Sequence, residues 1–276
     1  MKVLITGANG MLGKDLCPVF EDNGLYVFPF SREDLDITDC NNAKAIIETV
    51  KPQIIINLAS YTNVEKAEED EDTAFKINKE GVENIAKISK ETGAILVHIS
   101  TDYVFDGTKN LPYTPSDTPN PLNKYGLSKL KGEEAVQKYA DKYYIIRTSW
   151  LYGLYRKNFV ETMVELANKG NNLNVVDDQT GTPTYTVDLA MGILNIIGKP
   201  YGIYHIANEG ETSWFNFAKE IFKLKNMDVN VSPCTSDNFK QKAKRPKYSV
   251  LRSDVPMRGW AEALKDYIKY KESLGK

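Results

Sequence analysis

The 276-residue sequence predicts an α/β fold with a doubly wound parallel sheet, and three observations carry this prediction. Short β-branched runs alternate with longer amphipathic stretches over the first 150 residues, which is the pattern of consecutive βαβ units. The strand-like runs are apolar throughout, as in QIIINLA, so helices should cover both faces of the sheet. A glycine-rich turn follows the first run directly, at the end of the strand where such sheets bind their ligands.

The expected elements follow one another in a regular order. Strands are predicted at KVLITG, YVFPF, QIIINLA, AILVHIS and YYIIRTSW, and helices at 13–21, CNNAKAIIETVK, DTAFKINKEGVENIAKISKETG and 125–139. The second of these helices places Ala43, Ile46, Ile47 and Val50 on one face, as expected for a helix packed on a sheet. Right-handed crossovers should connect the strands.

Beyond residue 150 the pattern is less regular. Helices are expected at 159–169, 187–197, 214–223 and 260–271, with short strands at 174–176 and 203–206. We therefore expect a main domain over residues 1–150 and a smaller α/β cap over 151–276, with some elements of the second part returning to the main sheet. A ligand should bind between sheet and cap.

Composition limits the possible partners. Lys plus Arg number 35 against 37 for Asp plus Glu, a net charge of −2, so no basic field favours nucleic acid or an anionic membrane. No segment approaches the roughly 20 apolar residues that cross a bilayer. The first residues enter a strand-like run without a signal-peptide pattern, which favours a cytoplasmic location. We expect a small-molecule ligand and a monomer or homodimer.

The cysteines and histidines do not indicate a metal site. Cys17, Cys40 and Cys234 are scattered and odd in number, which is typical of reduced thiols. His98 and His205 each lie in a strand-like apolar run, so they are expected in the core or at its rim. No metal ligand set is predicted.

The first motif is Gly7-Ala-Asn-Gly10-Met-Leu-Gly13, between the first strand and the first helix. Its glycines allow a tight turn and close approach of a pyrophosphate to the helix N-terminus, where free N–H groups and the dipole favour anions. Three spaced glycines alone would also fit a plain turn. The strand before and the helix after them favour a dinucleotide-binding, Rossmann-type site.

The end of the second strand bears on the choice of coenzyme. An acidic residue there would bind the ribose hydroxyls of NAD. This chain has Ser31 and Arg32, and a hydroxyl beside a guanidinium suits the 2′-phosphate of NADPH. NADPH is therefore predicted, with NADH possible if Arg32 is solvated and Glu33 or Asp34 contacts the ribose instead.

The second motif is Tyr125-Gly-Leu-Ser-Lys129, in which the phenol and the ammonium share one helix face. A neighbouring cation would lower the pKa of the tyrosine and make it a workable acid near neutral pH. The end of the fourth strand, Ser100-Thr101-Asp102, can add a hydroxyl to the same reacting oxygen. A lone YxxxK is weak evidence, but this position after the fourth strand strengthens it.

Longer strings carry a family resemblance over nearly the whole chain. NLASYTNVEKAEED, STDYVFDG, YGLSKLKGE, RTSWLYG, DDQTGTPTYTVDLA and AKRPKYSVL resemble the extended short-chain dehydrogenase/reductase family and, within it, the dTDP-4-dehydrorhamnose reductases. The resemblance implies NAD(P)H-dependent reduction of the C4 keto group of dTDP-4-dehydro-L-rhamnose to dTDP-L-rhamnose, for cell-surface polysaccharide.

The resemblance also implies roles for single residues. Thr101, Tyr125 and Lys129 would be catalytic. With the motif residues above, the expected cofactor site comprises Gly7, Gly10, Met11, Leu12, Gly13, Ser31, Arg32, Asp36, Ile37, Leu58, Ala59, Ser60, Tyr61, Thr62, Tyr125 and Lys129. The expected substrate site comprises Thr101, Asp102, Trp150, Asn158, Thr182, Thr184 and Arg245.

Several interpretations stay open at this point. Arg245 could approach the substrate diphosphate or lie in a solvated loop, and Asp102 could contact substrate or cap the following loop. Asp15 and Asp188 roughly match acidic residues that hold magnesium in some dimeric relatives, but no metal is assigned. Trp214 and Trp260 are expected in the cap core.

Three other functions remain to be weighed. The related 4,6-dehydratases carry Thr-Asp-Glu where this chain has Thr101-Asp102-Tyr103, which favours simple reduction. The chain could act on another nucleotide-linked deoxysugar as a reductase or epimerase. It could also be a non-catalytic NADP-binding regulatory subunit, because it resembles the regulatory subunit of methionine adenosyltransferase.

Overall fold

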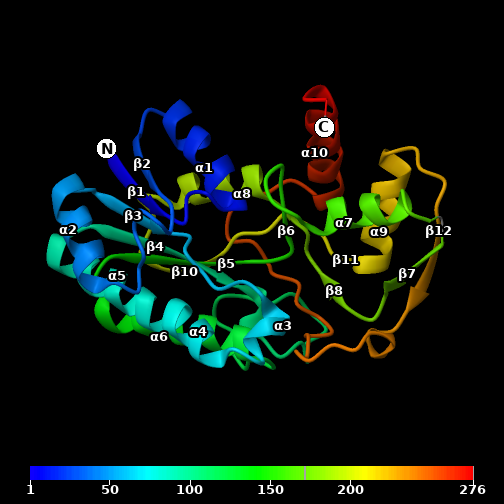
Figure 1. The fold of residues 1–276 in the computed structure, drawn as a ribbon, viewed down its shortest axis with the longest axis horizontal. Coiled ribbons are helices and arrows are strands. Elements are labelled where there is room, and N and C mark those ends of the chain that lie inside the picture. The colour runs from blue at the N-terminus through cyan, green and yellow to red at the C-terminus, as the bar shows by residue number, and fades with distance from the viewer. Residues whose placement is uncertain (171, 276) are drawn as a thin grey trace.

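Six parallel strands form the central sheet of the computed structural model, which describes residues 1–170 and 172–275. They are β1 (Lys2–Thr6), β2 (Tyr26–Phe30), β3 (Ile54–Asn57), β4 (Ile95–Thr101), β5 (Tyr143–Thr148) and β10 (Gly202–His205). Their order in the sheet is β10-β5-β4-β3-β1-β2 (Figure 1). The chain leaves β1 towards β2 and returns on the other side to β3, so the doubly wound fold is confirmed.

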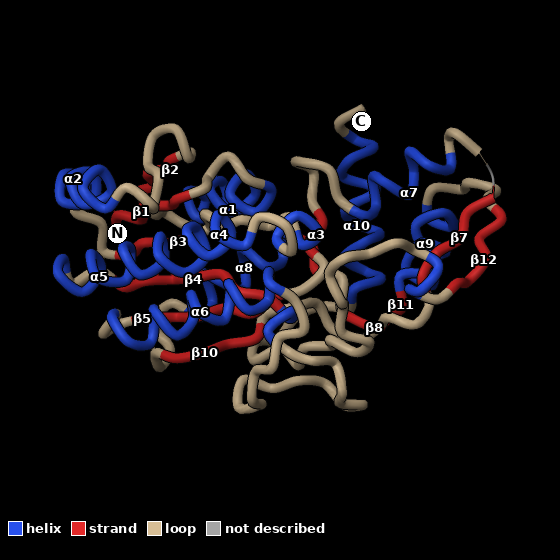
Figure 2. The backbone as a smooth tube through the Cα atoms, turned by 60° about the horizontal axis from the view of Figure 1, so that its bottom comes forward, coloured by secondary structure: helices blue, strands red, loops and turns tan. Residues whose placement is uncertain are grey.

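Helices cover both faces of this sheet, as its apolar strands require. α1 (Met11–Asp22) and α8 (Thr186–Ile196) pack on one face, where Ile5 and Leu16 share a core. α2 (Cys40–Val50), α5 (Val82–Thr92) and α6 (Lys124–Tyr139) pack on the other, where Leu4 and Ile85 share a second core. Figure 2 shows the second set lying along the strands.

The stretch predicted as one long helix contains an irregular turn. α4 (Glu71–Phe75) continues into a π-helical turn, η1 (Lys76–Gly81), and then into α5. The widened turn holds Asn78 fully buried, with its side chain in a hydrogen-bond network. Apolar periodicity could not reveal this turn, because the contacts that hold it come from residues far away in the sequence.

The cap has its own aromatic core. Its helices are α7 (Phe159–Ala167), α9 (Trp214–Leu224) and α10 (Trp260–Ser273), and its short strands are β6 (Leu151–Tyr152), β7 (Asn172–Val176), β8 (Thr180–Gly181), β9 (Thr184–Tyr185), β11 (Thr212–Ser213) and β12 (Asn230–Cys234). Trp214 and Trp260 pack against this core, as predicted. β12 was not predicted, since its polar, proline-containing sequence forms a strand only by pairing with β7.

Two elements beyond residue 150 belong to the main layers. β10 pairs in parallel with β5 at the edge of the sheet, and α8 packs beside α1. The remaining short elements are α3 (Val64–Ala67), η2 (Asp102–Val104) and η3 (Ser236–Asn238). The main sheet is therefore completed by chain from both halves of the sequence.

The histidines and cysteines behave as expected. His98 and His205 are fully buried, and burial lowers the pKa of each imidazole, that of His205 to about 3. All three cysteines are free thiols. Within residues 1–170 and 172–275, no helix is long and apolar enough to span a membrane, and no group of three potential His, Cys, Asp or Glu ligands converges.

Candidate active site

The glycine-rich turn brings the end of β1 close to neighbouring backbone. Gly7 has φ +64°, and a Cβ atom there would lie 2.8 Å from the Ala59 amide nitrogen. A Cβ atom at Gly13 would lie 2.5 Å from the Ala8 carbonyl oxygen. α1 begins after Gly10 without a side-chain cap and without an acidic residue in its first turn. Its positive end is therefore open to an anion from the cavity.

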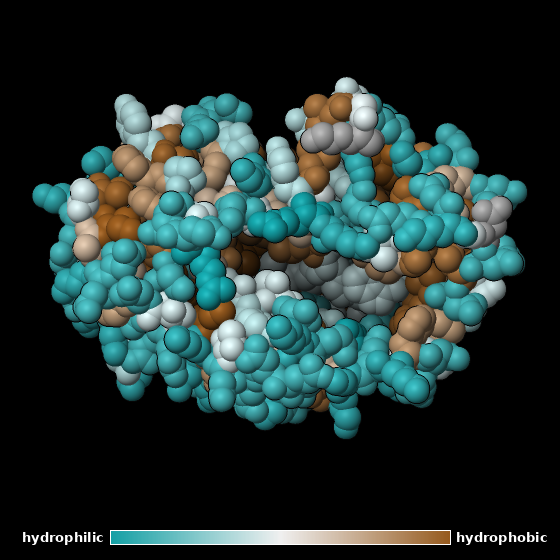
Figure 3. Space-filling view, viewed as in Figure 1, coloured by the Kyte–Doolittle hydropathy of each residue, from teal (hydrophilic) through white to brown (hydrophobic). Residues whose placement is uncertain are grey.

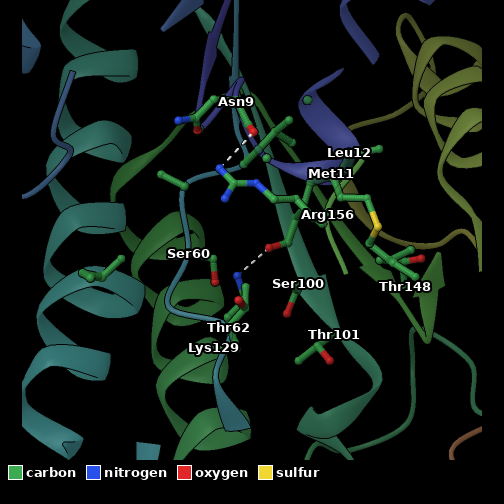
Figure 4. Close-up of a pocket in the computed structure, with 18 of the residues that line it drawn as sticks. Asn9, Met11, Leu12, Ser60, Thr62, Ser100, Thr101, Lys129, Thr148 and Arg156 are labelled. Atoms are coloured by element: carbon green, nitrogen blue, oxygen red, sulfur yellow. Dashed lines mark hydrogen bonds between the residues drawn. The ribbon is translucent and has the colours of Figure 1, made fainter. Parts of the chain in front are cut away.

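A cavity of about 690 Å³ runs from this turn along the carboxyl ends of the strands to the cap. It opens as a hollow between the two halves of the molecule in Figure 3. The predicted site residues that line it are Gly7, Gly10, Met11, Leu12, Gly13, Arg32, Asp36, Ile37, Leu58, Ala59, Ser60, Thr62, Thr101, Asp102, Tyr125, Lys129 and Trp150. The structure thus brings together segments from six parts of the sequence. Figure 4 labels residues from several of them.

Six predicted residues do not line the cavity: Ser31, Tyr61, Asn158, Thr182, Thr184 and Arg245. Asn158 is the N-cap of α7, where its Oδ1 accepts from the Glu161 N–H at 3.2 Å. Thr182 and Thr184 are fully buried, and Thr182 donates to the Gly210 carbonyl at 3.1 Å. These polar groups already have partners within the cap.

The other three have partners in the main domain. Arg245 forms an ion pair with Glu65 at 2.6 Å, and this pair ties the loop after η3 to α3. The Tyr61 N–H donates to Asn78 Oδ1 at 2.8 Å. The Ser31 N–H donates to Asp34 at 3.0 Å.

Ser100, noted above as part of the run Ser100-Thr101-Asp102, also lines the cavity. Nine further lining residues were not predicted from the sequence: Asn9, Leu35, Ile77, Ile99, Thr148, Ser149, Leu151, Arg156 and Lys157. Thr148 ends β5 and Ser149 follows it, so the rule that ligands bind at strand ends could have found them. Arg156 and Lys157 lie in the loop between β6 and α7. No local pattern in the sequence connects that loop with the glycine-rich turn.

Thr101, Tyr125 and Lys129 meet at the end of β4. Asn123 caps α6 by accepting from the Gly126 N–H at 2.8 Å, which fixes the start of the helix that carries Tyr125 and Lys129. Lys129 Nζ donates to the Ile99 carbonyl at 2.6 Å. The Thr101 hydroxyl donates to Asp102 Oδ1 at 3.0 Å and also interacts with the Tyr125 hydroxyl.

The prediction that Lys129 lowers the pKa of Tyr125 is wrong for the protein by itself. Burial raises the pKa of the Tyr125 phenol to about 12, although the Thr101 hydroxyl acts in the opposite direction. Burial also lowers the pKa of the Lys129 ammonium to about 8. Desolvation is the largest cause of both shifts, and the Lys129 ammonium donates to the Ile99 carbonyl.

Asp102 lies at the cavity wall and begins η2. Burial raises the pKa of its carboxyl group to about 6, against hydrogen bonds from Ser249 and Thr101. Its backbone carbonyl accepts from the Phe105 N–H at 3.0 Å. Asp102 therefore both shapes the following loop and faces the cavity.

Trp150 forms the cavity wall on the cap side. It has φ +48°, and its indole stacks on Trp214 with ring centroids 3.4 Å apart and an interplanar angle of 5°. A Cβ atom at Gly181 would lie 2.4 Å from the Trp150 ring, so this glycine leaves room for the indole. The two tryptophans form one flat aromatic surface.

At the other end of the cavity, Arg32 forms an ion pair with Asp36 at 3.5 Å. Both residues line the cavity, whereas Glu33 and Asp34 do not. Asp34 is occupied by the Ser31 N–H. Arg32 therefore places a positive charge at the cavity just after β2, with Asp36 beside it.

A doubly wound sheet with a glycine-rich turn after its first strand, and Thr, Tyr and Lys side chains from β4 and α6 at one cavity, defines the short-chain dehydrogenase/reductase class of oxidoreductases. The family model described as "RmlD substrate binding domain" matches residues 1–272, and the chain belongs to this family. The resemblance seen in the sequence is thereby confirmed.

Three relatives illustrate the match. A dTDP-4-dehydrorhamnose reductase of Clostridium acetobutylicum is 46% identical, with a TM-score of 0.96 over 99% of this chain and 100% of that chain. A dTDP-4-dehydrorhamnose reductase of Bacillus anthracis, solved in complex with NADP, is 42% identical with a TM-score of 0.95 over 98% and 99%. A dTDP-4-keto-6-deoxy-D-glucose reductase of Streptomyces niveus is 39% identical over 95% of this chain and 94% of that protein.

Proposed function

We propose that this protein uses NADPH to reduce the C4 keto group of dTDP-4-dehydro-L-rhamnose, giving dTDP-L-rhamnose. The observation that carries the proposal is the convergence of Thr101, Tyr125 and Lys129 beside a cavity whose far end is the glycine-rich turn. Relatives at 42% and 46% identity along the whole chain carry the reductase name.

The residues present fit a dinucleotide. Gly7 and Gly13 let the turn pack against the backbone of Ala59 and Ala8, where a Cβ atom would clash, and the uncapped start of α1 suits a pyrophosphate. Met11 and Leu12 lie at that helix start, Asp36 and Ile37 would lie beside the adenine, and 58–62 would follow the ribose and phosphates. When bound, NADPH supplies a hydride.

The chain's own residues handle the proton and the charge. Tyr125 would donate its phenolic proton to the sugar oxygen, so that the carbonyl becomes a hydroxyl once carbon receives the hydride. Thr101 would donate a hydrogen bond to the same oxygen, and Lys129 would keep positive charge near the phenol. The raised pKa of Tyr125 keeps its proton available at neutral pH.

Preference for NADPH over NADH follows from Arg32, which can pair with a 2′-phosphate through two hydrogen bonds. The exclusion of Glu33 and Asp34 from the cavity supports this assignment. Kinetics with both coenzymes test it, and a clear preference for NADH would remove Arg32 from the role.

The finer organisation is proposed in the same way. Residues 1–150 would bind the cofactor, and 151–276 would form most of the sugar-nucleotide site, with Trp150 against the deoxysugar. Asn158, Thr182, Thr184 and Arg245, which lie outside the cavity, would contact the substrate only if the cap moves. A cytoplasmic monomer or homodimer would meet the needs of this reaction.

The decisive experiment mixes the purified protein with dTDP-4-dehydro-L-rhamnose and NADPH, follows the absorbance of NADPH and identifies the sugar product. Stoichiometric dTDP-L-rhamnose is the expected result. Tight NADPH binding with no substrate-dependent oxidation would overturn the proposed reaction and would direct attention to a regulatory role.

A second candidate is the reduction of another dTDP-linked 4-keto sugar, because the Streptomyces niveus relative carries the name of a dTDP-4-keto-6-deoxy-D-glucose reductase. The same assay with dTDP-4-keto-6-deoxy-D-glucose separates the two. A higher kcat/KM for that sugar would favour the second candidate.

A further inference from the structure

Arg156 is a cationic side chain at the cavity with no role in the reaction described above. It lies in the loop between β6 and α7, is exposed, and lines the cavity together with the glycine-rich turn. Its guanidinium donates from Nη2 to the Asn9 carbonyl at 3.3 Å, across 147 positions of sequence. Figure 4 shows the side chain reaching across to Asn9, close to Met11 and Leu12 at the start of α1.

The backbone at Arg156 is unusual. Its φ is +70°, a left-handed conformation that glycine adopts easily and that a residue with a Cβ atom adopts at a cost. Such a conformation points the side chain in a direction that an ordinary turn would not give. Backbone strain of this kind next to a ligand cavity is a reason to look for function in the side chain.

Of the cationic side chains that line the cavity, Arg156 also makes the weakest contacts with the rest of the protein. Arg32 pairs with Asp36, Lys157 pairs with Glu165 at 2.6 Å, and Lys129 donates to a carbonyl at 2.6 Å. Among the residues that the structure describes, Arg156 has no carboxylate at ion-pair distance, and its contact with Asn9 is a single long hydrogen bond. Most of the five N–H donors of its guanidinium remain available.

We propose that Arg156 binds a phosphate group of the dinucleotide beside the start of α1. The inference rests on the proposed function, because it needs a dinucleotide at the glycine-rich turn. The start of α1 would hold the phosphate with backbone N–H groups, and Arg156 would add a charge-assisted hydrogen bond from the other half of the chain. The Asn9 carbonyl holds the guanidinium in place until the phosphate replaces it.

The variant Arg156→Gly tests the contribution of Arg156 to dinucleotide binding without destabilising the fold. Glycine fits φ +70° without strain, so the variant should unfold at a temperature equal to or above that of the wild type. Loss of one charge-assisted hydrogen bond should raise the Kd for NADP⁺ about tenfold. The rise of Kd with added salt should also be smaller in the variant, because one ionic contact with the ligand is gone.

Two control variants isolate these effects. Asn226→Gly removes another side chain at positive φ (+51°) outside the cavity lining, and it should leave Kd unchanged. Arg252→Gln removes an exposed positive charge outside the cavity lining and should also leave Kd unchanged. Comparison of NADP⁺ with NAD⁺ then locates the contact. Equal weakening assigns it to the pyrophosphate, and weakening of NADP⁺ alone assigns it to the 2′-phosphate.

The outcomes distinguish this inference from the proposed function. Tight binding of NADP⁺ to the wild type with an unchanged Kd in Arg156→Gly would overturn the role of Arg156 alone. An unchanged Kd accompanied by a raised KM for the sugar nucleotide would also overturn it, because the contact would then be to the substrate. A wild type that binds neither dinucleotide would overturn the proposed function, and the inference with it.

Discussion

Asn78 Nδ2 donates a hydrogen bond to Ser128 Oγ at 2.9 Å, which links the π-helical turn η1 to the helix that carries Tyr125 and Lys129. The same amide also donates to the Tyr61 carbonyl at 3.0 Å, and its Oδ1 accepts from Ser60 and from the Tyr61 N–H. The fully buried Asn78 side chain therefore fixes the position of the 58–62 segment relative to α6. Both elements line the cavity.

We predict that Asn78→Ala lowers the free energy of unfolding by about 2 to 3 kcal/mol, because four hydrogen bonds are lost at a buried site. The Kd for NADP⁺ should rise several-fold as the 58–62 segment loosens. Urea unfolding and a binding titration measure the two effects. Asn23→Ala, which removes one exposed hydrogen bond to Val19, is the control, and an equally small effect at Asn78 would contradict the prediction.

Glu133 and Arg147 form an ion pair that is almost completely excluded from solvent, with Nη2 to Oε2 at 2.6 Å and Nε to Oε1 at 3.0 Å. Glu133 Oε1 also accepts from Ser100, a residue of the cavity wall. Glu133→Ala should cost about 3 to 5 kcal/mol of stability, because it leaves a buried guanidinium without a counter-charge. Chemical unfolding measures the loss.

An apolar pair provides the matched comparison for this site. In Glu133→Leu combined with Arg147→Met, neither charge of this pair remains, and most of the lost stability should return. A Glu133→Ala variant within about 1 kcal/mol of the wild type would show that water reaches the pair.

The pH dependence of stability should report on Lys129. Its pKa is about 8 in the folded protein and about 10.4 in an unfolded chain, so the folded protein binds this proton more weakly than the unfolded chain does. Unfolding then takes up a proton between these values, and wild-type stability gains with pH across that window. Lys129→Met, which has no charge to desolvate, should exceed the wild type by up to about 3 kcal/mol at pH 7 and lose this advantage by about pH 10.5.

Urea unfolding of both proteins from pH 7 to pH 10.5 measures this difference. Lys131→Met, on the same helix but partly exposed, is the control and should show no such convergence. A constant difference between Lys129→Met and the wild type at all pH values would mean that Lys129 has an ordinary pKa.

Tyr125→Phe should retain NADP⁺ binding within about twofold and lose about 10²- to 10⁴-fold in kcat, since it removes only the proton donor. Steady-state kinetics with the sugar nucleotide and a binding titration give the two values. Tyr139→Phe, at the far end of α6, should behave like the wild type. Turnover of Tyr125→Phe near the wild-type rate would remove Tyr125 from the mechanism.

The sequence by itself determined the layer architecture and the local motifs. Apolar strands that alternate with amphipathic helices predict a parallel sheet covered on both faces. Gly7, Gly13, Tyr125 and Lys129 are recognised from their spacing to residues nearby in the sequence. Such patterns can be recognised in a single sequence, because they depend only on the periods of the strand and the helix. The predicted residues at the glycine turn and on α6 accordingly all line the cavity.

Only the tertiary structure decided which distant groups meet and how burial alters their chemistry. The reach of Arg156 to Asn9, the contacts of Asn78 and the stacking of Trp150 on Trp214 join segments separated by 17 to 147 positions. The pKa of Tyr125 moved opposite to the prediction, because desolvation depends on the atoms that surround a group rather than on its spacing from a lysine. Long-range contact and burial are properties of the packed chain, and no local pattern encodes them.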